Sequence, residues 1–183
     1  MREPPEVLAS EIIAETRIFR VEHRELKFDN GTVVNYERLR GRKHGAVLVV
    51  PMRTASEVLM IREYAGGTHR YELALPKGLI DEGETIFEAS NRELMEEIGY
   101  GARQLRHLDT LTVAPGYLDH QTHIVLAMDL YPSNLEGDEP EEIEVVPWSL
   151  TDLNGLLARD DVTEARSIAA LFMAREVLAN DQL

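Results

Sequence analysis

Apolar and polar positions alternate along the first part of the chain, which is the period of half-buried strands. Residues 11–39 have this pattern, and the segments 17–28 and 33–40 lie on either side of Asn30-Gly31. An Asn-Gly pair readily adopts the positive φ angles of a tight turn. The sequence therefore predicts a β-hairpin whose two arms are these segments.

Short apolar runs bounded by turn residues continue after the hairpin. They lie at 45–52, 57–64, 70–75, 101–116, 122–130 and 142–148. Runs of this length favour strands over helices, and the run at 101–116 leads into a loop. Residues 1–8 are rich in proline and glutamate, and we expect them to be loose.

The segment 86–98 has helical signals instead. Thr85 and Glu88 have the spacing of a capping box, and Gly99 stands where helices often end in a left-handed residue. The residues expected to face the core are Phe87, Leu94 and Ile98. A glycine-rich loop is expected at 78–84, directly before this helix.

Two further helices are expected near the end of the chain. One begins near Ser149, and the other begins near Asp161 with Glu164 at a capping-box position. The order of elements predicts an α+β fold with a mixed sheet between helices. We divide the chain into an N-terminal strand extension, 1–44, and a main domain, 45–183.

Charge and composition narrow the function. The formal net charge of −14 disfavours binding to nucleic acid, and a small anionic substrate would need a mediating cation. No apolar run approaches the roughly 18 residues of a membrane span. The chain has no cysteine and no signal-peptide pattern, so we expect a cytoplasmic protein without a membrane partner.

Three glutamates crowd one side of the predicted helix 86–98. Glu93 meets Glu96 and Glu97 at spacings of three and four residues, where like charges cost roughly 0.2–0.5 kcal/mol per pair. A solvated acidic face is the common interpretation of such a cluster. A hard divalent cation, which prefers oxygen ligands, would instead turn the repulsion into a binding site.

The wider spacing around these glutamates is specific. It has the form G-x5-E-x7-R-E-L-x-E-E-x-G-Y, made by Gly78, Glu84, Arg92, Glu93, Leu94, Glu96, Glu97, Gly99 and Tyr100. This pattern resembles the signature box of the Nudix hydrolases. Every fixed position is filled, and Tyr100 replaces the usual aliphatic residue at the last one. The resemblance implies a Nudix fold, a mixed β-sheet sandwiched between helices, with an N-terminal β-hairpin extension.

The resemblance also implies a reaction, the hydrolysis of a nucleoside diphosphate linked to another moiety. Glu93 and Glu97 would be the principal ligands of Mg²⁺, or alternatively Mn²⁺. Glu96 would be a further ligand or act in catalysis, and the carbonyl of Lys77 would complete the set. Glu84 and Arg92 would form a structural ion pair.

A general base is expected outside the box. The segment 135–145 carries six acids: Glu136, Asp138, Glu139, Glu141, Glu142 and Glu144. Similarity to ADP-ribose-cleaving Nudix enzymes, whose catalytic glutamate precedes the last core strand, makes Glu139 and Glu141 the candidates. Most of these acids are equally compatible with a solvated loop.

Residues outside the box resemble the ADP-ribose pyrophosphatase branch. Pro115 follows Tyr100 by 15 residues, and Tyr36 matches an aromatic that stacks on adenine. A turn proline and a cross-strand aromatic are the alternative interpretations. The same branch pairs two subunits through its N-terminal strands, so we expect a homodimer.

Two departures broaden the expected substrates. Ala65 replaces a diphosphate-binding arginine, for which Arg62 or Arg70 would substitute, and His120 replaces a glutamate. The expected substrates are ADP-ribose, NADH and diadenosine oligophosphates. A sensor that binds such a ligand without turnover, or a hydrolase of another nucleotide, remains an alternative.

Overall fold

A computed structural model describes residues 2–41, 43–137 and 139–180. Its contacts group residues 1–43 with 112–121, and residues 44–111 with 122–183. We call these the extension unit and the core unit. The segment 112–121 thus belongs with the N-terminal strands, although it lies far from them in sequence.

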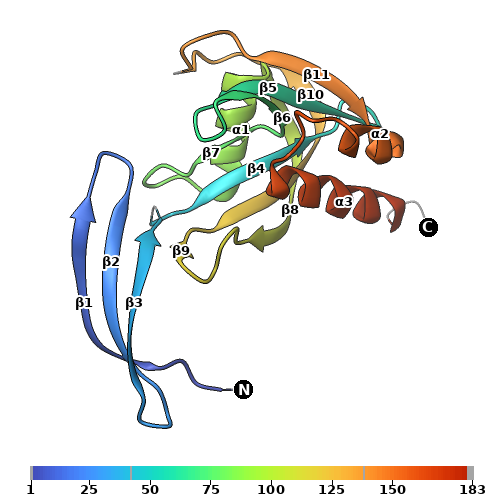
Figure 1. The fold of residues 1–183 in the computed structure, drawn as a ribbon. Coiled ribbons are helices and arrows are strands. Elements are labelled where there is room, and N and C mark those ends of the chain that lie inside the picture. The colour runs from blue at the N-terminus through green and yellow to red at the C-terminus, as the bar shows by residue number, and fades with distance from the viewer. Residues whose placement is uncertain (1, 42, 138, 181–183) are drawn as a thin grey trace. The chain divides into compact units, whose positions relative to one another are not determined.

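Among the described residues, the strands of the extension unit form a four-stranded sheet (Figure 1). Its order is β1 (Glu6–Glu15), β2 (Arg20–Lys27), β3 (Val33–Arg40) and β9 (Leu118–Asp119), antiparallel except that β9 runs parallel to β3. The predicted hairpin between β2 and β3 is confirmed, and Gly31 has a φ of 80°.

The expectation that residues 1–8 are loose is wrong for Glu6, Val7 and Leu8. These residues begin β1, and Glu6 pairs with Lys27 of β2. Local composition did not reveal this strand because the pairing partner is about twenty residues away in sequence.

The described residues of the core unit form two sheets and three α-helices. One sheet has the order β7 (Lys77–Leu79), β4 (Ala46–Pro51), β10 (Thr122–Pro132), β8 (Tyr100–Leu111); the other has the order β11 (Glu144–Ser149), β5 (Glu57–Ala65), β6 (Arg70–Ala74). The helices are α1 (Ile86–Glu97), α2 (Leu153–Leu157), which follows a short 3₁₀ turn at Leu150–Asp152, and α3 (Ala165–Asn180). Strand β10 is parallel to β4 and antiparallel to β8, so the first sheet is mixed.

The helices cover opposite faces of the mixed sheet. Successive residues of β4 are buried on both sides, because strand side chains alternate between faces. Val47 belongs to an apolar cluster with Leu94 of α1, whereas Leu48 belongs to a cluster with Leu171 of α3 (Figure 1). This arrangement confirms the predicted α+β fold with a mixed sheet between helices.

Helix α1 forms as its sequence indicates. Both bonds of the capping box between Thr85 and Glu88 are present, and Gly99 has a φ of 72° after the last turn. The prediction that Phe87 faces the core is wrong, since this residue is 44% exposed. Phe87 lies seven residues before Leu94 and so points toward the same side of α1. That spacing does not ensure that the sheet extends far enough to cover the first turn of α1.

Two other expected boundaries differ. Gly78 and Leu79 belong to β7 rather than to a loop, because they pair with β4. Helix α3 begins at Ala165, and the carboxylate of Glu164 accepts from the Ser167 N–H at 2.7 Å, so Glu164 precedes the helix. In the described part of the chain, no helix has both the length and the apolarity needed to cross a membrane.

Candidate active site

Helix α1 carries its glutamates into a partly buried site at the edge of the mixed sheet. Glu93 and Glu97 are only 7% and 5% exposed, and Glu96 is half-buried. Because Glu93 and Glu97 lie one helical turn apart, they share a side of the helix. Burial of two carboxylates rules out a simple solvated acidic face for this pair.

The first glycine of the box touches this site. A Cβ atom added to Gly78 would lie 2.0–2.2 Å from the carboxylate of Glu93. A side chain at position 78 would therefore fit only if the Glu93 carboxylate moved, so glycine there lets Glu93 keep its position. The box spacing between Gly78 and Glu93 therefore reflects direct contact between the two residues.

We expect the substitution Gly78→Ala to displace Glu93 and lower activity at least tenfold, with a loss of stability of about 1–3 kcal/mol from overpacking. The control is Gly66→Ala, because a Cβ at Gly66 meets no atom within 4 Å. Thermal unfolding and steady-state kinetics of both variants test this. Equal activity of the two variants would contradict the assigned contact.

Strand β7 presents the backbone of Lys77 to Glu97. The Lys77 N–H donates to Glu97 Oε2 at 3.0 Å. The Val49 N–H of β4 donates to the carbonyl of Pro76, so the backbone of Pro76 points toward β4. Backbone groups of successive residues in a strand point in opposite directions. Those of Lys77, which lies opposite Leu48, therefore point away from β4. Its carbonyl therefore faces the same edge as its N–H, as the predicted metal-ligand role requires.

Arg92 connects the loop before the helix to the glutamates. It donates two bonds to Glu84, at 2.8 and 3.0 Å, which confirms the predicted ion pair. It also donates to Glu93 at 2.7 Å and to Glu96 at 3.0 Å, contacts that the sequence did not indicate. The guanidinium group of Arg92 thus bonds to three carboxylates. Glu97 instead accepts a hydrogen bond from the backbone N–H of Lys77.

Burial leaves these carboxylates short of compensating charge. It raises the pKa of Glu97 to about 8, and it also raises the pKa of Glu93 although Arg92 opposes the effect. Among the described residues, no three acidic or histidine side chains form a group that could hold a metal ion. Arg92 engages both Glu93 and Glu96. The donor set consists only of oxygen atoms and includes two buried carboxylates, so its chemistry fits Mg²⁺ or Mn²⁺.

The acidic segment after β10 lies against the C-terminal part of α1. Leu135 N–H donates to the Met95 carbonyl at 3.1 Å. A Cβ at Gly137 would lie 2.3 Å from the Glu139 carboxylate and 3.7 Å from Glu96 Cβ. Glu139 is therefore next to the glutamates of α1, and its charge contributes to the raised pKa of Glu93.

The other candidate base points elsewhere. Glu141 accepts a hydrogen bond from the Tyr71 hydroxyl of β6 at 2.6 Å. Nothing in the sequence pointed to Tyr71, because it is 70 residues from Glu141. Asp138, the acid before Glu139, lies outside the described residues.

The arginines proposed in place of Ala65 are both engaged by carboxylates. Arg62 bonds to Glu144 at 2.8 Å and also to Asp161. Arg70, the first residue of β6, pairs with Ala65 of β5 and donates to Glu72 at 2.7 Å. Contact of Arg62 with substrate stays a prediction.

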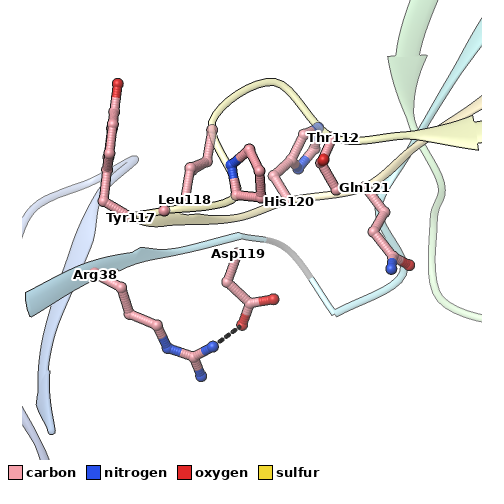
Figure 2. Close-up of a pocket in the computed structure, with 9 residues that line it drawn as sticks. Arg38, Thr112, Tyr117, Leu118, Asp119, His120 and Gln121 are labelled. Carbon is pink, nitrogen blue, oxygen red and sulfur yellow. Dashed lines mark ion pairs between the residues drawn. The ribbon is translucent and has the colours of Figure 1, made fainter. Parts of the chain in front are cut away.

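The extension unit has a pocket of about 210 Å³ (Figure 2). Pro115, which was predicted to contact substrate, lines it together with His120 and Arg38. Figure 2 shows Arg38 pointing toward Asp119, to which it is paired at 3.1 Å. Tyr36 does not line this pocket; its ring centroid lies 6.5 Å from that of Phe28.

A buried carboxylate holds the arginine of this pocket. Glu22 is 4% exposed and accepts bonds from Ser10, Arg38 and Arg40. Burial alone would raise the pKa of Glu22, but these bonds outweigh it and lower the pKa to about 2. Arg38 is therefore held in place by an ionised partner at neutral pH.

Family comparisons agree with this geometry. The NUDIX domain family matches residues 42–172, and the family described as the NudE-type Nudix hydrolase N-terminal domain matches residues 5–38. The chain belongs to the Nudix hydrolase family.

The chain is also similar to individual proteins of known activity. The chain is 48% identical to the ADP compounds hydrolase NudE of Escherichia coli, over 95% of this chain and 93% of that protein. It is 31% identical to the ADP-ribose pyrophosphatase of Mycobacterium tuberculosis, over 94% of this chain and 84% of that protein. A crystal structure of an ADP compounds hydrolase superposes with a TM-score of 0.92 at 46% identity, covering 99% of this chain and 97% of the other.

Proposed function

We propose that this protein hydrolyses the diphosphate linkage of ADP-linked compounds with the help of Mg²⁺, or alternatively Mn²⁺. The observation that carries the proposal is the 48% identity to an ADP compounds hydrolase over nearly the whole chain, including the extension. The expected substrates are ADP-ribose, NADH and diadenosine oligophosphates. Water adds to one phosphorus and the bridging oxygen leaves, giving AMP or another adenine nucleotide and the remaining phosphate ester.

The site of α1 supports the metal part of this proposal. Glu93, Glu97 and Glu96 would hold the cation together with the Lys77 carbonyl. When bound, Mg²⁺ supplies neutralisation of the phosphate oxygens and a lowered pKa for a coordinated water. The ammonium group of Lys77 is itself paired with Glu63 at 2.7 Å.

Glu139 is the general base in this proposal. It is next to Glu96, whereas the carboxylate of Glu141 is bonded to Tyr71. An ionised carboxylate at this position takes a proton from the attacking water as the oxygen–phosphorus bond forms. Substrate contacts of Arg62, Tyr36 and Pro115 and a cytoplasmic location remain part of the proposal.

The experiment is a substrate panel. Purified protein is incubated with Mg²⁺ and ADP-ribose, NADH, diadenosine oligophosphates, nucleoside triphosphates and a capped RNA end, and nucleotide products and phosphate are measured. The proposal predicts AMP or another adenine nucleotide from the ADP-linked compounds above all others. Preferred turnover of triphosphates or RNA ends, or stoichiometric binding without product, would contradict it.

We further propose a homodimer formed through the extension unit. Its strand β1 exposes apolar side chains on the described surface: Val7, Leu8, Ile12 and Ile13 are 45–49% exposed. Such a row on an edge strand is suited to burial against a second copy.

Light scattering is expected to give twice the mass of 20.7 kDa. The variant Ile12→Glu is expected to shift the protein toward the monomer, and a monomeric wild-type protein would refute the proposal.

A further inference from the structure

The described residues of the acidic segment between β10 and β11 form hydrogen bonds with the rest of the core unit on both sides of Glu139. Near its start, Leu135 N–H bonds to the Met95 carbonyl of α1 at 3.1 Å. Near its end, Glu141 accepts the bond from Tyr71 of β6 at 2.6 Å. Glu139 lies between these two attachments. Its position therefore depends on both.

The link between Glu139 and Glu141 is short and stiff. Pro140 has a fixed φ angle, and its ring also restricts Glu139, the residue before it, to extended conformations. Because the backbone between them has few conformations, a displacement of Glu141 also displaces Glu139. The Glu139 carboxylate occupies space that a side chain at position 137 would fill, since a Cβ added to Gly137 would lie 2.3 Å from Glu139 Oε2.

The ring of Tyr71 is held independently of the loop. Tyr71 lies directly opposite Tyr64 on β5, and the two rings meet edge to face at 5.8 Å and 69°. The Tyr64 hydroxyl bonds to His69 Nδ1 at 2.6 Å rather than to a residue of the acidic segment. Tyr64 lines a small cavity with Glu139, Pro140 and Glu141, but its hydroxyl bonds to His69, whereas the Tyr71 hydroxyl bonds to Glu141.

We propose that Tyr71 is a positioning residue: its hydroxyl holds Glu141 and thereby keeps Glu139 beside the glutamates of α1. This inference rests on the proposed function, in which Glu139 is the base. In this proposal Glu141 has a structural role. Its side chain accepts the hydrogen bond from the Tyr71 hydroxyl, and a neutral acceptor would accept the same bond. The carboxylate charge of Glu141 is then dispensable, whereas its ability to accept a hydrogen bond is essential.

The test compares matched variants on ADP-ribose with Mg²⁺. Tyr71→Phe removes the bond to Glu141, and Tyr64→Phe removes an equivalent hydroxyl that bonds elsewhere. We expect kcat to fall about tenfold in Tyr71→Phe with KM within about twofold, and to stay within about twofold in Tyr64→Phe. Glu141→Gln keeps an acceptor and should stay near wild-type activity, whereas Glu141→Ala should match Tyr71→Phe.

A double-mutant cycle and hydrogen exchange complete the test. Tyr71→Phe combined with Glu141→Ala should be no worse than either single variant, because both remove one bond. Exchange of the backbone amides in 139–143 should speed up in Tyr71→Phe and not in Tyr64→Phe. Additive effects, equal kcat for the two phenylalanine variants, or a raised KM with unchanged exchange would overturn the inference.

These readouts separate the inference from the proposed function. Absence of turnover by the wild-type protein on any ADP-linked compound would refute the proposed function. The exchange comparison would still decide whether Tyr71 holds the segment, since it needs neither metal nor substrate. Unchanged exchange in Tyr71→Phe overturns the positioning role even where kcat falls.

Discussion

Replacing Glu97 by glutamine is expected to lower kcat/KM on ADP-ribose by about 10³-fold or more while the fold remains intact. The amide oxygen of glutamine still accepts the Lys77 N–H, which lies 3.0 Å from the Glu97 carboxylate. What disappears is a buried negative charge that would hold a cation. Steady-state kinetics with Mg²⁺ and far-ultraviolet circular dichroism of both proteins measure the two parts of this prediction.

The same variant has a predicted effect on stability. Burial raises the pKa of Glu97 from an ordinary 4.5 to about 8, so the ionised form disfavours folding. The contribution of this carboxyl is fully present below pH 4.5 and is lost as pH rises through 8. Without Mg²⁺ at pH 8, Glu97→Gln should therefore be more stable than wild type by about 1–3 kcal/mol.

A control distinguishes the site from the general acidity of the region. Glu82 is exposed in the loop before α1, so Glu82→Gln should leave both activity and stability unchanged. If Glu97→Gln retained wild-type turnover, or if it were less stable than wild type at pH 8 without metal, the assignment of Glu97 would be wrong.

Replacing Glu139 by glutamine is expected to lower kcat about 10²–10⁴-fold, the usual effect of removing a general base. Its side chain lies beside Glu96, where Gly137 leaves room for it. Binding of Mn²⁺ should be nearly unchanged, since Glu139 is not among the proposed principal ligands.

The matched control is Glu136→Gln in the same acidic segment. Glu136 is exposed, so its neutralisation should change kcat less than about twofold. Glu141→Gln should behave likewise. If Glu141→Gln lost activity while Glu139→Gln kept it, the base would be Glu141 and the structural distinction between the two glutamates would fail.

Features set by neighbouring residues were predictable from the sequence. The capping box of Thr85 and Glu88, the left-handed Gly99 and the Glu84–Arg92 ion pair all involve residues within one short segment. Their geometry depends on helix and turn rules that apply wherever such a segment occurs. The box pattern therefore gave the fold class and the candidate metal ligands together.

Features set by tertiary pairing were not predictable in the same way. The bond from Tyr71 to Glu141 joins residues 70 positions apart, and no local pattern announces it. Strand β1 depends on its pairing with β2 rather than on its own composition. The sharing of Arg92 among several glutamates follows from burial, which a single sequence does not reveal.

The central claim is that the carboxylates of α1 act through a divalent cation on a diphosphate of an ADP-linked compound. The most direct measurement is the formation of AMP from ADP-ribose by protein stripped with EDTA, before and after Mg²⁺ is added back. We predict no AMP before addition and stoichiometric AMP and ribose phosphate after it. Turnover at full rate without a divalent cation, or no AMP with Mg²⁺ present, would contradict the claim.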